Sequence, residues 1–216
     1  MLWRGVARGS TLDFQWPASY LIGMINRRLA LGAVLLLPAV ARAQSPATAV
    51  EGFHAALLDI MHNATRLGVR GRFDRLAPVM GQVFDLAAMT RIAVGPSWTG
   101  FTAGDQAALT EAFSRWSIAT YAARFDGFSG ESFATQGVQA TANGDQLVRT
   151  VLNRPAGQEP VVLSYLLRQG RVVDVYLTGT ISELASRRSE FAGLIREGGA
   201  PRLLNELQRR HAALLG

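Results

Sequence analysis

The segment Val161-Val-Leu-Ser-Tyr-Leu-Leu-Arg168, Gln169-Gly170, Arg171-Val-Val-Asp-Val-Tyr-Leu-Thr178 sets the fold class of this chain. Its two halves are rich in β-branched and aromatic residues, which predicts strands over 160–168 and 171–178. Gln169-Gly170 is a two-residue turn signal, so the strands should pair as an antiparallel hairpin. Apolar residues alternate along both strands, which favours a sheet with one covered face.

The regions on either side of this hairpin complete the predicted fold. Two further strands are expected over 132–141 and 145–153, with Asn143-Gly144 and Pro155-Ala-Gly157 as turn signals. Helical periodicity predicts helices over 46–67, 72–81, 85–93 and 103–125 before the strands, and over 181–195 and from Pro201 onward after them. This order indicates an α+β domain: a four-stranded antiparallel sheet with helices packed on one face.

Residues 1–43 are typical of an export segment rather than of a folded domain. Met24-Ile-Asn-Arg-Arg28 is a short basic start, 29–40 is a short apolar run, and Ala41-Arg42-Ala43 is a small-x-small cleavage site before Gln44. These are the three regions of a secretory signal peptide, and the apolar run is too short to span a bilayer. We therefore expect an upstream extension and signal peptide over 1–43, cleavage after residue 43, and one domain over 44–216.

The charge of the chain also favours export over nucleic-acid binding. The sequence has 22 Lys+Arg, all of them arginine, and 16 Asp+Glu, for a net charge of +6. Removing 1–43 takes away five arginines and one aspartate, which leaves 17 basic and 15 acidic residues, or +2. That balance lacks the charge excess of a nucleic-acid-binding domain. The absence of cysteine excludes a lipid-acylated lipoprotein, so we expect a periplasmic protein with no stable membrane insertion.

The predicted helix over 103–125 has apolar residues on two sides. At 100° per residue, Leu109, Phe113 and Trp116 lie within about 60° of one another, whereas Ile118 and Tyr121 lie on roughly the opposite side. A helix on a protein surface needs only one apolar stripe. Two stripes indicate either a helix buried on both sides or a helix that is packed on one side and lines a cavity on the other.

Few residues point to catalysis or metal binding. His54 and His62 lie eight residues apart on one predicted helix, about 80° from each other, which is the wrong spacing for an i,i+4 metal pair. His211 is among arginines near the end of the chain. The sequence contains no nucleophile elbow, phosphate-binding loop or His-Glu-x-x-His motif. We therefore expect no enzyme, no metal and no cofactor.

Two blocks of residues carry a family resemblance. The first block is Phe84-Asp85, Met89, Gly95-Pro-Ser-Trp98, Thr102, Gln106, Phe113 and Tyr121. The second block is 162–165, Val172-Val-Asp-Val175, Arg188-Ser-Glu-Phe191, Ile195, Gly199, Leu203 and Leu207. In order and spacing, both blocks resemble those of the MlaC-type, or toluene-tolerance, periplasmic proteins over about 47–210. The segment 121–133 is further similar to the hopanoid-associated HpnM branch.

This resemblance implies a periplasmic lipid-binding shuttle of an ABC-type intermembrane phospholipid transport system. Acyl chains would be held in an apolar cavity enclosed between the sheet and the helices. The implied partners are an inner-membrane ABC transporter complex and an outer-membrane lipoprotein complex. The HpnM resemblance makes a hopanoid, or another polycyclic lipid, the alternative ligand. The chain departs from the family pattern at Arg187, where a Tyr is common.

Burial of one acyl chain contributes on the order of 10 kcal/mol, because each buried CH₂ is worth roughly 0.8 kcal/mol. Chain burial alone therefore predicts weak selectivity for the head group, which would lie in solvent. The residues expected to contribute to the cavity are Phe113, Trp116, Tyr121, Val148, Leu152, Tyr165, Val175 and Leu194.

Two other functional classes stay open on the sequence. An enzyme on a cone-shaped α+β fold that acts on an apolar substrate would bring Asp85, Asp174 or Tyr176 into the cavity. A structural interaction module would instead use its apolar residues as core and would have no cavity.

Overall fold

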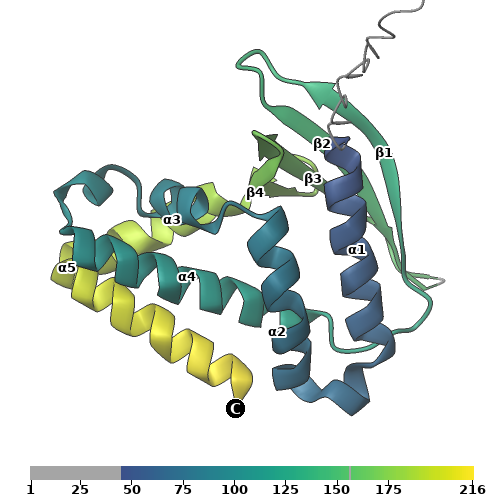
Figure 1. The fold of residues 1–216 in the computed structure, drawn as a ribbon, viewed down its shortest axis with the longest axis horizontal. Coiled ribbons are helices and arrows are strands. Elements are labelled where there is room, and N and C mark those ends of the chain that lie inside the picture. The colour runs from purple at the N-terminus through teal and green to yellow at the C-terminus, as the bar shows by residue number, and fades with distance from the viewer. Residues whose placement is uncertain (1–44, 156) are drawn as a thin grey trace, which may run out of the picture. The chain divides into compact units, whose positions relative to one another are not determined.

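Helices, then strands, then a broken helix follow one another along the chain (Figure 1). The computed structural model describes residues 45–155 and 157–216, so the predicted extension, signal peptide and cleavage site over 1–43 lie outside the described residues. The elements are α1 (Pro46–His62), α2 (Ala64–Val83), α3 (Leu86–Val94), the 3-10 helix η1 (Gly95–Gly100), α4 (Ala103–Arg124), β1 (Ser132–Ala140), β2 (Gln146–Asn153), β3 (Val161–Arg168), β4 (Arg171–Leu177), β5 (Ile181–Ser182) and α5 (Glu183–Leu215).

The strands form one antiparallel sheet in the order β1-β2-β3-β4-β5. The predicted hairpin is confirmed as β3 and β4, in which Tyr165 pairs with Val175. The predicted number of strands was wrong, because the sheet has five strands rather than four. The fifth strand is two residues long, and Ser182 pairs with Tyr176. A two-residue strand is too short to show a period of two, so the sequence predicts the start of a helix there instead.

The first predicted helix, over 46–67, is divided in the structure. Its apolar stripe is buried as expected, with Phe53 and Leu57 fully enclosed. However, α1 ends at His62, and the Asn63 side chain donates to the carbonyl of Asp59 at 2.8 Å. The chain re-enters a helix at Ala64 and bends at Gly68, whose φ of 59° is not helical. The helix is therefore interrupted at Asn63, which the sequence did not predict, and again at Gly68, where the predicted helix over 46–67 ends.

The final helix has the interruption that its glycines predicted. α5 begins after Ser182, whose side chain accepts from the backbone N–H of Ala185 at 2.9 Å. Gly198 and Gly199 have non-helical backbone angles, so the two helices expected over 181–195 and from residue 201 are the two arms of α5. Within 45–155 and 157–216, every helix falls short of the length or the hydrophobicity that spanning a membrane requires.

The core lies between one face of the sheet and the helices, as the sequence predicted. Figure 1 shows α1 lying against β1 and β2, while α4 and α5 pack against each other farther along. Phe53 of α1 meets Tyr165 of β3 and Tyr121 of α4, with ring centroids 6.4 Å and 5.4 Å away, both edge-on. Phe113 of α4 meets Phe191 of α5 at 6.3 Å. One group of aromatic rings therefore joins α1 to β3 and α4, and a second group joins α4 to α5.

Candidate functional site

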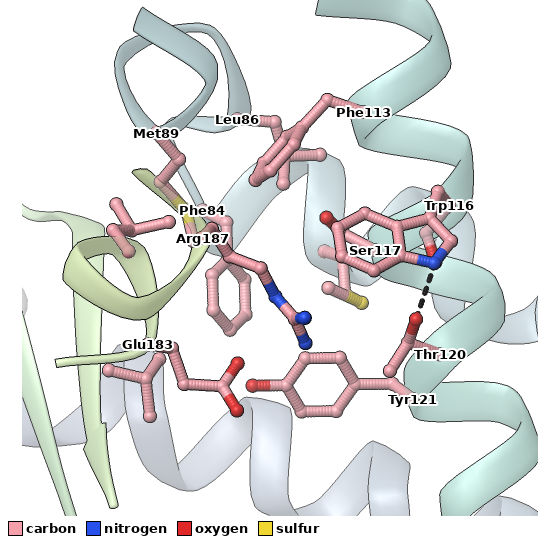
Figure 2. A pocket seen from close by; sticks show the side chains of 13 residues that line it. Phe84, Leu86, Met89, Phe113, Trp116, Ser117, Thr120, Tyr121, Glu183 and Arg187 are labelled. Carbon is pink, nitrogen blue, oxygen red and sulfur yellow. Dashed lines mark hydrogen bonds between the residues drawn. The ribbon is translucent and has the colours of Figure 1, made fainter. Parts of the chain in front are cut away.

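A largely apolar pocket opens where α4, α3 and the first turns of α5 meet strand β4 (Figure 2). The cavity volume is about 30 Å³, which is room for one or two water-sized groups. The lining residues are Met80, Phe84, Leu86, Met89, Phe113, Trp116, Ser117, Thr120, Tyr121, Val175, Glu183, Leu184 and Arg187.

Helix α4 supplies the longest wall of this pocket. Its lining residues are Phe113, Trp116, Ser117, Thr120 and Tyr121, which follow the i, i+3, i+4, i+7, i+8 spacing of one helix face. Tyr121, expected on the side opposite to Phe113, lies about 80° from it and lines the same pocket. On another side of α4, Ile118 and Ala122 are buried in the core, as the dual pattern allowed. α4 is therefore a helix that is packed on one side and lines a cavity on the other.

The mouth of the pocket carries polar and charged side chains. Ser117 and Thr120 line it from α4, and the Thr120 hydroxyl donates to the carbonyl of Trp116 at 2.9 Å (Figure 2). Glu183 and Arg187 line it from α5, and their side chains are 23% and 25% exposed. The pocket thus has an apolar floor and a charged rim, which is the arrangement that an amphiphile requires.

The phenol of Tyr121 lies on the pocket wall beside Glu183 (Figure 2). Burial raises the pKa of Tyr121 well above its ordinary value, and the negative charge of Glu183 raises it further, against a smaller opposing effect of Arg124. Tyr121 therefore remains a neutral hydroxyl at every physiological pH. It offers a hydrogen-bond donor and an aromatic face, but no charge.

Four of the eight predicted cavity residues line the pocket and four do not. Phe113, Trp116, Tyr121 and Val175 lie on its wall. Val148 and Tyr165 are fully buried in the core, whereas Leu152 and Leu194 are partly buried and pack against it. Of the residues that the prediction missed, Ser117 and Thr120 share a helix face with Phe113, so the periodicity of α4 could have found them. Glu183 and Arg187 had no local signal.

The residues proposed for an enzymatic alternative have other positions. The carboxylate of Asp85 caps α3 by accepting from the backbone N–H of Ala88 at 2.9 Å. Asp174 accepts from the Ser182 hydroxyl at 2.6 Å, and Tyr176 pairs with Ser182 across the edge of the sheet. None of these three candidates is among the residues that line the pocket. In the part of the chain that the structure describes, no group of three or more His, Asp or Glu side chains is suited to hold a metal ion.

Comparisons with known proteins agree with this architecture. A phospholipid-binding protein from Ralstonia solanacearum, solved in complex with a phospholipid, has the same fold with a TM-score of 0.67. The two chains are 24% identical, and the match covers 78% of this chain and 98% of the other. No curated protein matches the sequence.

A family model described as MlaC protein matches residues 52–209, well over half of the chain. This match confirms the family that the two sequence blocks resemble, and it does not distinguish the HpnM branch from the rest. The chain belongs to the MlaC family.

Proposed function

We propose that this protein is a periplasmic lipid carrier of an ABC-type intermembrane phospholipid transport system. The observation that carries the proposal is the pocket of aromatic and aliphatic side chains between the sheet and helices α3, α4 and α5. Membership of the MlaC family and the fold shared with a phospholipid-binding protein support it. The signal peptide expected within 1–43, after an upstream extension, would export the chain and release a domain of residues 44–216.

The energetics of such a carrier depend on hiding acyl chains from water. A single chain that is fully buried contributes on the order of 10 kcal/mol, so affinity does not require many directed hydrogen bonds. The cavity volume of about 30 Å³ is much smaller than an acyl chain, so binding requires the pocket to widen. Met80 and Met89 line it, and their unbranched thioether side chains repack more readily than branched or aromatic ones. We propose that these two methionines move aside for the chain.

The same affinity makes release slow unless a partner assists it. The partners that we propose are an inner-membrane ABC transporter complex and an outer-membrane lipoprotein complex. Protein loaded with a labelled phospholipid should deliver it to liposomes that contain the transporter complex faster than to liposomes of the same composition without it. Equal delivery to both would contradict the role in transport but not the binding of lipid.

Identification of the bound lipid tests the proposal most directly. Native mass spectrometry and extraction of the purified protein should reveal a co-purified lipid. Glycerophospholipid would support the main proposal, whereas a polycyclic lipid would support the hopanoid alternative. Protein that never carries or takes up lipid would contradict both.

A blocked pocket provides the matched variant. Ser117 faces the pocket and is half-buried, so Ser117→Trp should fill the mouth and abolish uptake of lipid from vesicles. Ser114→Trp is the control, because Ser114 is on the same helix, is also half-buried and is absent from the pocket lining. Equal uptake by the two variants would show that lipid does not enter this pocket.

A further inference from the structure

Arg187 places a cation at the boundary between the apolar pocket and solvent. Its guanidinium carbon lies 4.7 Å from the centroid of the Trp116 ring, within range of a cation–π contact. Figure 2 shows the guanidinium pointing across the pocket, between Glu183 and Trp116. A charged group that emerged from the pocket would therefore meet Arg187 directly.

The charges around Arg187 leave one positive charge in excess. Arg187 donates to Glu190 at 3.2 Å, and Glu190 also accepts from Arg210. Glu206 accepts from Arg209 and Arg210, each at 2.7 Å. These three arginines thus share two carboxylates. A guanidinium has five N–H donors, and Arg187 donates one hydrogen bond within the part of the chain that the structure describes.

Two adjoining ion pairs leave this excess unchanged. Arg124 pairs with Glu183 at 3.4 Å, and Arg202 lies 3.5 Å from Glu197. Each of these pairs adds one positive and one negative charge and is therefore neutral. The whole cluster therefore retains a formal excess of one positive charge, which equals in magnitude the charge of a single phosphate diester.

A groove beside the pocket is lined by further arginines. Trp116 and Thr120 line both the pocket and a groove of about 380 Å³ between α4 and the C-terminal arm of α5. The groove is also lined by Arg124, Arg209 and Arg210. The guanidinium of Arg210 lies over the same Trp116 ring as that of Arg187, 5.7 Å from its centroid. A head group at the rim beside Trp116 would therefore have the guanidinium groups of Arg187 and Arg210 next to it.

We propose that Arg187 binds the phosphate of the lipid head group, with Arg210 beside it, and so selects phosphate-bearing amphiphiles over neutral lipids with the same acyl chains. The proposal rests on the lipid-binding function proposed above and replaces the weak head-group selectivity expected from chain burial alone. A guanidinium can hold two phosphate oxygens at once, and the apolar floor beneath it strengthens the attraction.

Two ligands with identical chains test the proposal. Dioleoylphosphatidylglycerol and dioleoylglycerol differ in the phosphate-bearing head, and each can displace a fluorescent lipid from the purified protein. We expect Arg187→Gln to weaken binding of the phosphatidylglycerol about tenfold or more and to leave dioleoylglycerol unaffected. Arg187→Lys keeps the positive charge but cannot hold two phosphate oxygens in the same planar geometry. Its affinity for phosphatidylglycerol should therefore lie between those of the wild type and Arg187→Gln. Arg196→Gln is the control: it makes the same charge change at an exposed position of α5 that does not line the pocket.

The possible outcomes separate the two proposals. Equal weakening of both ligands by Arg187→Gln would show that the arginine only supports the shape of the pocket, and an unchanged affinity for both would show that it contacts neither. Either result overturns the phosphate contact while lipid binding stands. Displacement by inorganic phosphate, at the concentrations at which phosphatidylglycerol acts, would overturn the assignment to a lipid head. A wild-type protein that binds neither lipid would instead overturn the proposed function.

Discussion

The Nε2 atom of His54 lies 3.0 Å from the hydroxyl oxygen of Tyr165 and joins α1 to β3 inside the core. His54 is only 4% exposed, and its ring stacks on Phe133 with 4.0 Å between the centroids. Burial lowers the pKa of His54 to about 4 and raises the pKa of Tyr165 well above its ordinary value. Both partners are therefore neutral in the folded protein, and protonation of the histidine would place an unpaired charge in the core.

Acid should destabilise the fold through His54. The pKa of His54 is about 4 when folded and 6.5 when exposed, so its neutral form contributes fully above pH 6.5, and this contribution is lost as the pH falls through 4. Between pH 7.5 and 4.5 the loss amounts to about 2–3 kcal/mol. Urea unfolding at both pH values should show this extra loss in the wild type relative to His54→Gln. Parallel pH profiles of the two proteins would contradict it.

Arg72 should stabilise the fold through backbone carbonyls. It is 7% exposed and donates to the carbonyls of Ala122 at 2.7 Å and Ala64 at 3.0 Å, which ties α2 to the last turn of α4. Arg72→Met keeps much of the packing but leaves both buried acceptors without this donor, so we expect the free energy of unfolding to fall by about 2–4 kcal/mol. Arg66→Met, at an exposed position of the same helix, should change it by less than about 0.5 kcal/mol. Urea unfolding of both variants gives the comparison.

Strand alternation predicted which face of the sheet is buried, but not which helix covers each residue. Tyr165 and Val175 pair directly across β3 and β4 and face the same side. Yet Tyr165 meets His54 of α1, whereas Val175 lines the pocket beside α4 and α5. The alternation of apolar residues along a strand is a local property of the sequence. Which helix packs on a given residue depends on where helices distant in the sequence dock. This is why half of the predicted cavity residues lie on the pocket wall and half lie elsewhere.

The charged rim escaped prediction for a related reason. Glu183 and Arg187 belong to α5, but the side chains that they meet, such as Trp116, belong to α4. Their placement follows from the turn after β4, which reverses the chain at Thr178 and Gly179 with φ values of 51° and 81°. Threonine rarely adopts a positive φ, so the sequence predicts neither this turn nor the strand β5 that follows it.

Asp174 should be a structural residue rather than a catalytic one. Its carboxylate accepts from the Ser182 hydroxyl at 2.6 Å and from the backbone N–H groups of Val175 and Leu184 at 2.8 Å and 3.3 Å, and so holds β5 and the start of α5. Asp174→Ala should lower the free energy of unfolding by about 1–3 kcal/mol, because these donors lose a charged acceptor. Lipid binding measured well below the melting temperature should persist. Loss of lipid binding in a variant that remains folded would assign Asp174 to the site.

Replacement of Gly95 by alanine should destabilise the protein, because its backbone angles disfavour a side chain and an added Cβ would crowd Arg188. It ends α3 at φ 71° and ψ −144°, a region that residues with a Cβ rarely adopt. A Cβ there would lie 3.2 Å from Cδ of Arg188, whose Nε donates to the carbonyl of Ile92 at 3.0 Å. Gly95→Ala should therefore cost about 1–3 kcal/mol of stability and loosen the contact between α3 and α5. Gly100→Ala is the control, because Gly100 is exposed, lacks a positive φ and has open space where a Cβ would stand. Thermal unfolding should show a clear loss for the first variant and almost none for the second, and equal melting temperatures would refute the argument.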